Sequence, residues 1–160
     1  MLVPNFFFLL LRKKSLEADD FPTPFRYIKP DLTAFIKRFS NLASDGEFQL
    51  ELAGWYFENK RYATGYITLT EAIVTYVCEW EGEDIRQKNS REKALAIIHS
   101  PQQEKRPLSQ LYFQISSIRN QVAHASLYEV KRGNRFETAI NKAFHFYKEV
   151  KQIFQTKTLG

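Results

Sequence analysis

The sequence predicts an all-α fold in which a five-helix bundle, residues 31–160, follows an irregular N-terminal arm, residues 1–30. After Pro30, apolar residues recur three and four positions apart, which is the pattern of one helix face. No stretch of useful length alternates apolar and polar residues with the two-residue period of a strand. The chain has only 6 Gly and 6 Pro, and four of the prolines lie in the arm, so helix breakers are rare in the predicted bundle.

Length and composition are those of a single globular domain. The chain of 160 residues suffices to bury a core, and its hydrophobic content of 44% is too high for a disordered protein. Cys78 is the single cysteine, which excludes an intrachain disulfide and favours a cytoplasmic location. The net charge of +5 favours anionic partners, nucleic acid first, although the excess is modest.

The N-terminal arm opens with a short apolar run, "NFFFLLL", followed by basic residues. The run is far shorter than the roughly 20 residues of a membrane-spanning helix. A secretory signal places its positive charges before the apolar run, and here they follow it. We therefore expect no membrane association, and a segment that packs on the core or links to another domain. The proline-rich "DDFPTPFRYIKP" predicts an extended connector.

Three segments in the first half of the predicted bundle have helical patterns. Residues 31–44 carry an apolar stripe, with Asp31 as a candidate N-cap. Residues 45–62 follow, and their stripe consists of Phe48, Leu52, Trp55 and Tyr56. Residues 62–80, "YATGYITLTEAIVTYVCEW", are apolar nearly all round, which is typical of a helix surrounded by others. We expect this segment to be the central and most buried helix.

The second half of the predicted bundle has three further patterned segments. Residues 90–100 read as a short helix with Ser90 as its cap. Residues 107–125 open with Pro107, which suits the first turn of a helix. Their apolar stripe consists of Leu108, Leu111, Tyr112, Ile115, Ile118 and Val122. Residues 135–154 form the last apolar stripe and close the fold.

The sequence gives little support for a metal site or for a catalytic nucleophile. The histidines fall on three different predicted helices without the paired spacing of metal ligands: His99, His124 and His145. We expect structural roles for His99 and His145, and neither a metal nor a cofactor. Cys78 lies within an apolar helix, where cysteine behaves as a small hydrophobe. Ser116 lacks the strand-to-helix turn that activates a nucleophilic serine.

Glu71 is unusual because its carboxylate interrupts the apolar stretch "TLTEAIVTY" of the predicted central helix. A carboxylate there needs a partner or an open edge. In one interpretation Glu71 lies at an ordinary exposed position or forms a structural ion pair. In the other, Glu71 supports a site by orienting Arg119.

The stretch "SSIRNQVAHASL" contains the candidate catalytic residues. Asn120 and His124 are four residues apart and share a helix face, while Ile118 and Val122 face the core. The long side chain of Arg119 flanks that exposed face. A guanidinium binds phosphate through two parallel hydrogen bonds, and an imidazole moves protons near neutral pH. These groups suffice for metal-free RNA cleavage by attack of the ribose 2′-OH, although the spacing alone also fits a helix end with capping charges.

The residues "IRNQVAHA" resemble the signature of HEPN ribonuclease domains, in which Arg, a short spacer with a polar first residue, and His end a helix of an all-α bundle. The spacer here is "NQVA", which puts Asn120 at the polar position. The upstream stretch "LELAGWYFENKRYATGYITLTEAIVTYVCE" is similar to the helical pair before the motif in CRISPR-associated HEPN proteins of type III systems. The resemblance covers roughly residues 31 to 155 and implies a HEPN-like bundle.

The resemblance implies a metal-independent endoribonuclease that cleaves single-stranded RNA as a homodimer with a composite active site. Arg119 and His124 match catalytic positions of the family, and Asn120 matches the supporting polar position. In CRISPR-associated members a CARF sensor domain accompanies the HEPN domain, and nothing in residues 1–30 is able to form one. We therefore expect such a sensor, or an antitoxin, to lie outside this chain.

Basic residues in the segment that follows the motif are candidate RNA-backbone contacts: Lys131, Arg132 and Arg135. They equally fit a solvated loop. Two other functional interpretations remain open, namely a catalytically inactive RNA-binding or dimerisation module and the HEPN toxin of a toxin–antitoxin pair.

Overall fold

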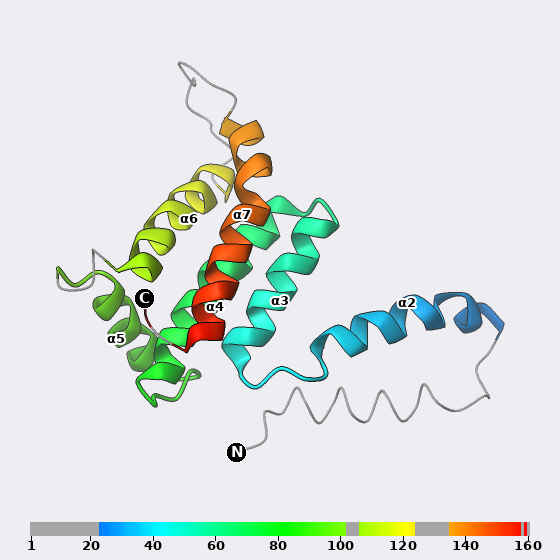
Figure 1. The fold of residues 1–160 in the computed structure, drawn as a ribbon, viewed down its shortest axis with the longest axis horizontal. Coiled ribbons are helices and arrows are strands. Elements are labelled where there is room, and N and C mark those ends of the chain that lie inside the picture. Colours follow the sequence, from blue (N-terminus) through cyan, green and yellow to red (C-terminus); the bar gives the residue numbers. More distant parts are fainter. Residues whose placement is uncertain (1–22, 102–105, 124–134, 158, 160) are drawn as a thin grey trace. The chain divides into compact units, whose positions relative to one another are not determined.

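The computed structural model describes residues 23–101, 106–123, 135–157 and 159, and within these ranges it contains six α-helices and no strand (Figure 1). The all-α prediction is confirmed for this part of the chain. The expected number of five helices is wrong, because the described ranges contain six, the first of which begins in the predicted arm. The chain separates into two compact units, residues 1–44 and 45–160.

The described part of the first unit consists of helix α2, Thr23–Phe39, and the non-helical residues 40–44. The extended connector predicted for "DDFPTPFRYIKP" is therefore wrong from residue 23 onward. Pro24 falls in the first turn, where a missing N–H leaves no helical bond unmade. Pro30 lies inside α2, where it removes one backbone bond without ending the helix. The predicted domain boundary after residue 30 consequently falls within a continuous helix.

The second unit is built around an antiparallel pair, α3 (Asp45–Glu58) and α4 (Tyr62–Trp80). Every residue of α4 from 72 to 78 is buried, so the prediction of a central helix at 62–80 is confirmed. Two glycines let the helices pack closely, Gly46 against the backbone of α4 and Gly65 against the Phe57 ring of α3. A Cβ added to Gly46 on α3 would lie 3.2 Å from Cα of Tyr76, and one added to Gly65 on α4 would lie 2.4 Å from Cε1 of Phe57.

Three further helices cover α4, namely α5 (Lys88–Ile98), α6 (Pro107–Ala123) and α7 (Arg135–Thr156). In Figure 1, α7 runs in front of α4, with α3 on one side and α6 on the other. Tyr66 donates a hydrogen bond to the carbonyl of Ala139 at 2.6 Å, and the Tyr76 ring stacks on Phe154 at 3.9 Å. These two contacts show that α7 runs parallel to α4.

Helix α5 covers only the C-terminal half of one α4 face. The Cys78 thiol donates to the carbonyl of Ser90 at 3.5 Å, and Arg91 donates to the Thr75 hydroxyl at 3.3 Å. Ser90 lies buried in the first turn of α5, and its hydroxyl donates to the carboxylate of Glu83 at 3.0 Å. Among the described helices, none is both long and apolar enough to span a membrane.

The contact between Gly65 and Phe57 yields a stability prediction. Replacing Gly65 with Ala adds about 1 kcal/mol of helix propensity but forces a methyl group into the Phe57 ring, which is 1% exposed and has no room to move. We expect Gly65→Ala to lower the free energy of unfolding by about 1–3 kcal/mol in urea titrations followed by circular dichroism. Thr64→Ala is the matched control, since this neighbouring side chain is exposed. Equal stability of the two variants would contradict the close approach.

Candidate functional site

The candidate site lies on the last turns of α6. Arg119 and Asn120 belong to this helix, and the structure describes it as far as Ala123. His124, Lys131 and Arg132 lie outside the described residues. Arg135 is the first residue of α7, but its side chain is outside the described part. The structure therefore places three of the seven predicted site residues, Arg119, Asn120 and Glu71, and leaves four without a described side chain.

Arg119 occupies the core-facing stripe of α6. The buried residues of this stripe follow helical spacing: Leu108, Leu111, Tyr112 and Ile115. Arg119, four residues after Ile115, is the next residue on the same face. Ile118 and Val122 also pack against the core, as predicted, and Asn120 is exposed. Arg119, which we expected to flank the exposed face, is instead partly buried where an apolar side chain would ordinarily lie. The helix thus directs a cation toward the edge of the core.

The guanidinium of Arg119 has no compensating group among the described residues. Its Nε is buried without a hydrogen-bond partner there, and no described carboxylate forms an ion pair with it. A buried polar atom without a partner costs about 1–3 kcal/mol, and more when the group is charged. An anion bound at this end of α6 would remove that cost.

Tyr112 lies near Arg119 on the same side of α6, seven residues earlier in the helix. Burial raises the pKa of the Tyr112 phenol, and the charge of Arg119 partly counteracts this effect. Glu71 also raises the pKa of this phenol, and a hydrogen bond with Ser116 lowers it. The Tyr112 ring is 6% exposed and meets the His99 ring edge-on at 5.7 Å. Arg119 and Glu71 therefore act in opposite directions on the pKa of one buried phenol.

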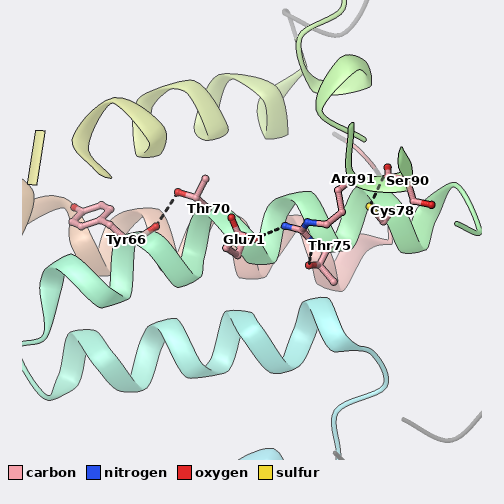
Figure 2. Close-up of polar contacts among 7 residues, drawn as sticks. All are labelled: Tyr66, Thr70, Glu71, Thr75, Cys78, Ser90 and Arg91. Carbon is pink, nitrogen blue, oxygen red and sulfur yellow. Dashed lines mark hydrogen bonds and ion pairs between the residues drawn. The ribbon is translucent and has the colours of Figure 1, made fainter. Parts of the chain in front are cut away.

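Glu71 pairs with Arg91 of α5 (Figure 2). The same guanidinium donates to the Thr75 hydroxyl, one helical turn further along α4. Glu71 is therefore in a structural ion pair, and the interpretation in which it orients Arg119 is not what the structure shows. Sequence reasoning missed Arg91, because no pattern in the chain indicates that α5 packs on this part of α4.

One face of α4 is covered at its C-terminal end and open at its N-terminal end. Thr64, Ile67 and Glu71 follow helical spacing on this face, and all three are exposed. Ile67 is 43% exposed, which is unusual for a large aliphatic residue on the central helix. Helix α6 runs antiparallel to α4, so its last turns lie at the same end of the bundle as this open face (Figure 1).

The remaining histidines have structural contacts. The His99 ring packs edge-on against Phe113 at 5.0 Å, and His145 lies 3.3 Å from the carboxylate of Glu149 one turn away. Within the described part of the chain, no group of three or more His, Cys, Asp or Glu side chains is arranged to hold a metal ion.

The pair formed by Glu71 and Arg91 yields a second prediction. Its side chains are 50% and 29% exposed, so water screens their attraction. In a double-mutant cycle with Glu71→Ala and Arg91→Ala, we expect a coupling energy below about 1 kcal/mol from urea unfolding. A coupling energy above about 2 kcal/mol would show that the pair is a main determinant of how α5 docks.

Comparison with known proteins finds one informative similarity. The chain is 34% identical over 117 residues to "CRISPR-associated protein MJ1674" of Methanocaldococcus jannaschii. The match covers 69% of this chain but only 18% of that longer protein. No protein-family model matches the chain. No solved structure matches it significantly either.

Proposed function

We propose that this chain is a metal-independent endoribonuclease domain that cleaves single-stranded RNA in CRISPR-associated defence. One observation carries the chemistry: Arg119 is a partly buried cation at the end of α6 with no described partner, next to the exposed Asn120. Similarity to a protein named as CRISPR-associated supports the defence setting over a toxin–antitoxin pair. The polarity of the site and the preference of a guanidinium for phosphate support RNA as the ligand.

In the proposed reaction, the ribose 2′-oxygen attacks the adjacent phosphorus and the bond to the 5′-oxygen breaks. The 2′-hydroxyl loses its proton to a base, and the departing 5′-oxygen gains a proton, so the products are a 2′,3′-cyclic phosphate and a 5′-hydroxyl. Arg119 stabilises the charge on the phosphoryl oxygens. His124 transfers one of the two protons. Asn120 orients the phosphate or the imidazole by hydrogen bonding.

The proposed active unit is a homodimer whose site takes one motif helix from each subunit. Two-fold symmetry places the same surface of both subunits in the interface. The open α4 face supports this arrangement, because it exposes Ile67 at the same end of the bundle as the last turns of α6. We further propose that Lys131, Arg132 and Arg135 contact the RNA backbone, and that a CARF sensor domain outside these residues supplies activation.

The first prediction from this proposal concerns cleavage itself. We expect Arg119→Ala and His124→Ala each to lower the cleavage rate of a labelled single-stranded RNA by at least about 100-fold, because each removes a group that acts on the reacting phosphate. Asn120→Ala is expected to have a smaller effect. EDTA should leave the rate unchanged, and a DNA strand of the same sequence should remain intact because it lacks the 2′-OH.

Gln121→Ala is the matched control on the same helix turn, since its side chain bonds only to Ser117 among the described residues. Cleavage by His124→Ala at the wild-type rate would reject the proposed chemistry. Salt-dependent RNA binding without turnover in the wild type would instead support an inactive RNA-binding module.

A further prediction concerns the dimer. Replacing Ile67 with Asp puts a charge on an exposed apolar position, so the fold should survive while self-association weakens. We expect analytical ultracentrifugation to show a shift toward monomer and cleavage to become more strongly dependent on protein concentration. Gln155→Asp, at an exposed position of α7 away from this face, is the charge control, and an unchanged dimer in Ile67→Asp would show that the open α4 face lies outside the interface.

A further inference from the structure

Two accessible aromatic rings lie on the surface where α3, α4 and α7 meet. Both pack against the ring of Phe57 on α3, which is 1% exposed. Tyr62, the first residue of α4, stacks on Phe57 with 6.3 Å between ring centroids, and Phe144 of α7 meets Phe57 edge-on, also at 6.3 Å. Phe144 is 41% exposed and Tyr62 is partly exposed. One buried ring thus positions two rings that a ligand can reach from solvent.

Three exposed cations adjoin these rings. Lys60 and Arg61 lie in the turn between α3 and α4, next to Tyr62, and Lys148 follows Phe144 by one turn of α7 on the same face. None of the three forms an ion pair with another described residue. Arg61 is also the N-cap of α4 without a side-chain cap, so the first N–H groups of this helix add partial positive charge. These five residues form an aromatic–basic surface: Lys60, Arg61, Tyr62, Phe144 and Lys148.

Lysine at position 60 is unfavourable for the fold. Its φ of 58° lies in the left-handed region, which glycine adopts most readily. The N–H groups of Lys60 and Arg61 donate to the carbonyls of Phe57, at 3.0 Å, and Tyr56, at 2.8 Å, in the helix ending that ordinarily has glycine at this position. A glycine would therefore form the same turn with less strain. The lysine adds a charge to the aromatic–basic surface and destabilises the turn.

The carboxylates on the adjoining turns do not cancel this charge. Glu51 of α3 accepts hydrogen bonds from Tyr147, at 2.9 Å, and from Lys151 of α7. Glu58, the last residue of α3, is the carboxylate next to the turn. Glu137 lies two helical turns before Phe144, or about 10 Å along the α7 axis. Cations therefore outnumber carboxylates around the two rings.

We propose that the aromatic–basic surface binds a single-stranded segment of the RNA, whose bases stack on the two rings while its phosphates pair with the three cations. The proposal rests on the proposed ribonuclease function for the identity of the strand. Aromatic rings beside cations bind unpaired nucleic acid with little sequence preference, because every base has a face that stacks. The cations favour a polyanion over an apolar protein surface, since burying unpaired charges against apolar groups is costly.

The aromatic–basic surface lies at the same end of the bundle as the candidate site. Tyr62 begins α4, and the antiparallel helix α6 ends beside that end of α4 (Figure 1). Tyr62 is about 140° around α4 from Ile67 of the open face, so a strand that reaches from Arg119 to the rings crosses the end of the bundle. The bases that stack there would lie several nucleotides from the cleaved phosphate. They would contribute to substrate affinity and leave the chemistry unchanged.

The test measures binding separately from cleavage. A labelled single-stranded DNA lacks the 2′-OH but has bases and phosphates, so we expect it to bind the full-length protein in fluorescence anisotropy. A duplex of the same length should bind at least about fivefold more weakly, because its base faces are stacked on each other. Phe144→Ala should weaken single-strand binding at least about fivefold, and Phe144→Trp should preserve it. Trp80→Ala is the aromatic control, since this 49% exposed ring is at the other end of α4.

The cations are tested by variants that do not threaten the fold. Lys60→Gly should raise the urea midpoint of unfolding, because glycine suits the left-handed backbone, and should nevertheless weaken strand binding. Lys60→Gly and Lys148→Ala should each lower the slope of log affinity against log salt concentration by about 0.7. Lys88→Ala is the charge control, because this exposed lysine pairs with Glu92 on α5.

The outcomes separate this inference from the proposed function. Strand binding with the expected variant effects, but without RNA cleavage by the wild type, would reject the proposed function alone. In an active enzyme, Phe144→Ala should raise KM and leave kcat unchanged, and an unchanged KM would reject this inference alone. Duplex binding as tight as single-strand binding, or unchanged strand affinity in Phe144→Ala, would also overturn it. A shift of Phe144→Ala toward monomer without a loss of strand affinity would assign the rings to a protein contact instead.

Discussion

Helix α4 must be covered on nearly every side, and the second unit is arranged to meet this requirement. A helix with apolar residues all round is stable in water only when other elements surround it. Helices α3, α5, α6 and α7 all pack on α4, and its residues from 72 to 78 have no exposed side chain. Helix α4 also caps the N-terminus of α3. The carboxylate of Glu79 accepts hydrogen bonds from the backbone N–H groups of Asp45, at 2.8 Å, and Gly46, at 3.3 Å.

The candidate site arises where that coverage ends. Helix α5 reaches only the C-terminal half of one α4 face, where Ser90 and Arg91 form hydrogen bonds with Cys78 and Thr75. The N-terminal half of the face stays open beside the last turns of α6. Arg119 enters this edge from the core-facing stripe, where water is partly excluded. The electrostatic attraction between the guanidinium and a phosphate bound there would be stronger than at a fully solvated surface, because the effective dielectric constant is lower.

The spacing of apolar residues in the sequence predicted the features that depend on a single helix. It did not predict the features that depend on how two helices pack together. The buried character of 62–80, the core positions of Ile118 and Val122, and the exposure of Asn120 follow from spacing within a helix. The partner of Glu71 depends on where α5 docks, which no spacing encodes. The partial burial of Arg119 could have been predicted, because Arg119 is four residues after Ile115 and shares its helix face. It was overlooked because a charged residue is not ordinarily counted in an apolar stripe. Residues 23–30 of helix α2 were missed because the prolines there outweighed the amphipathic pattern.

Helix α6 holds the candidate site in place through its own packing. Its core-facing stripe is buried, and Arg119 belongs to the same register as Ile115. Any change that rotates α6 would therefore move the Arg119 guanidinium away from its position at the edge of the core. Fixed geometry of this kind is what the proposed cleavage needs, because a phosphodiester reacts only when it is held in line with the attacking oxygen.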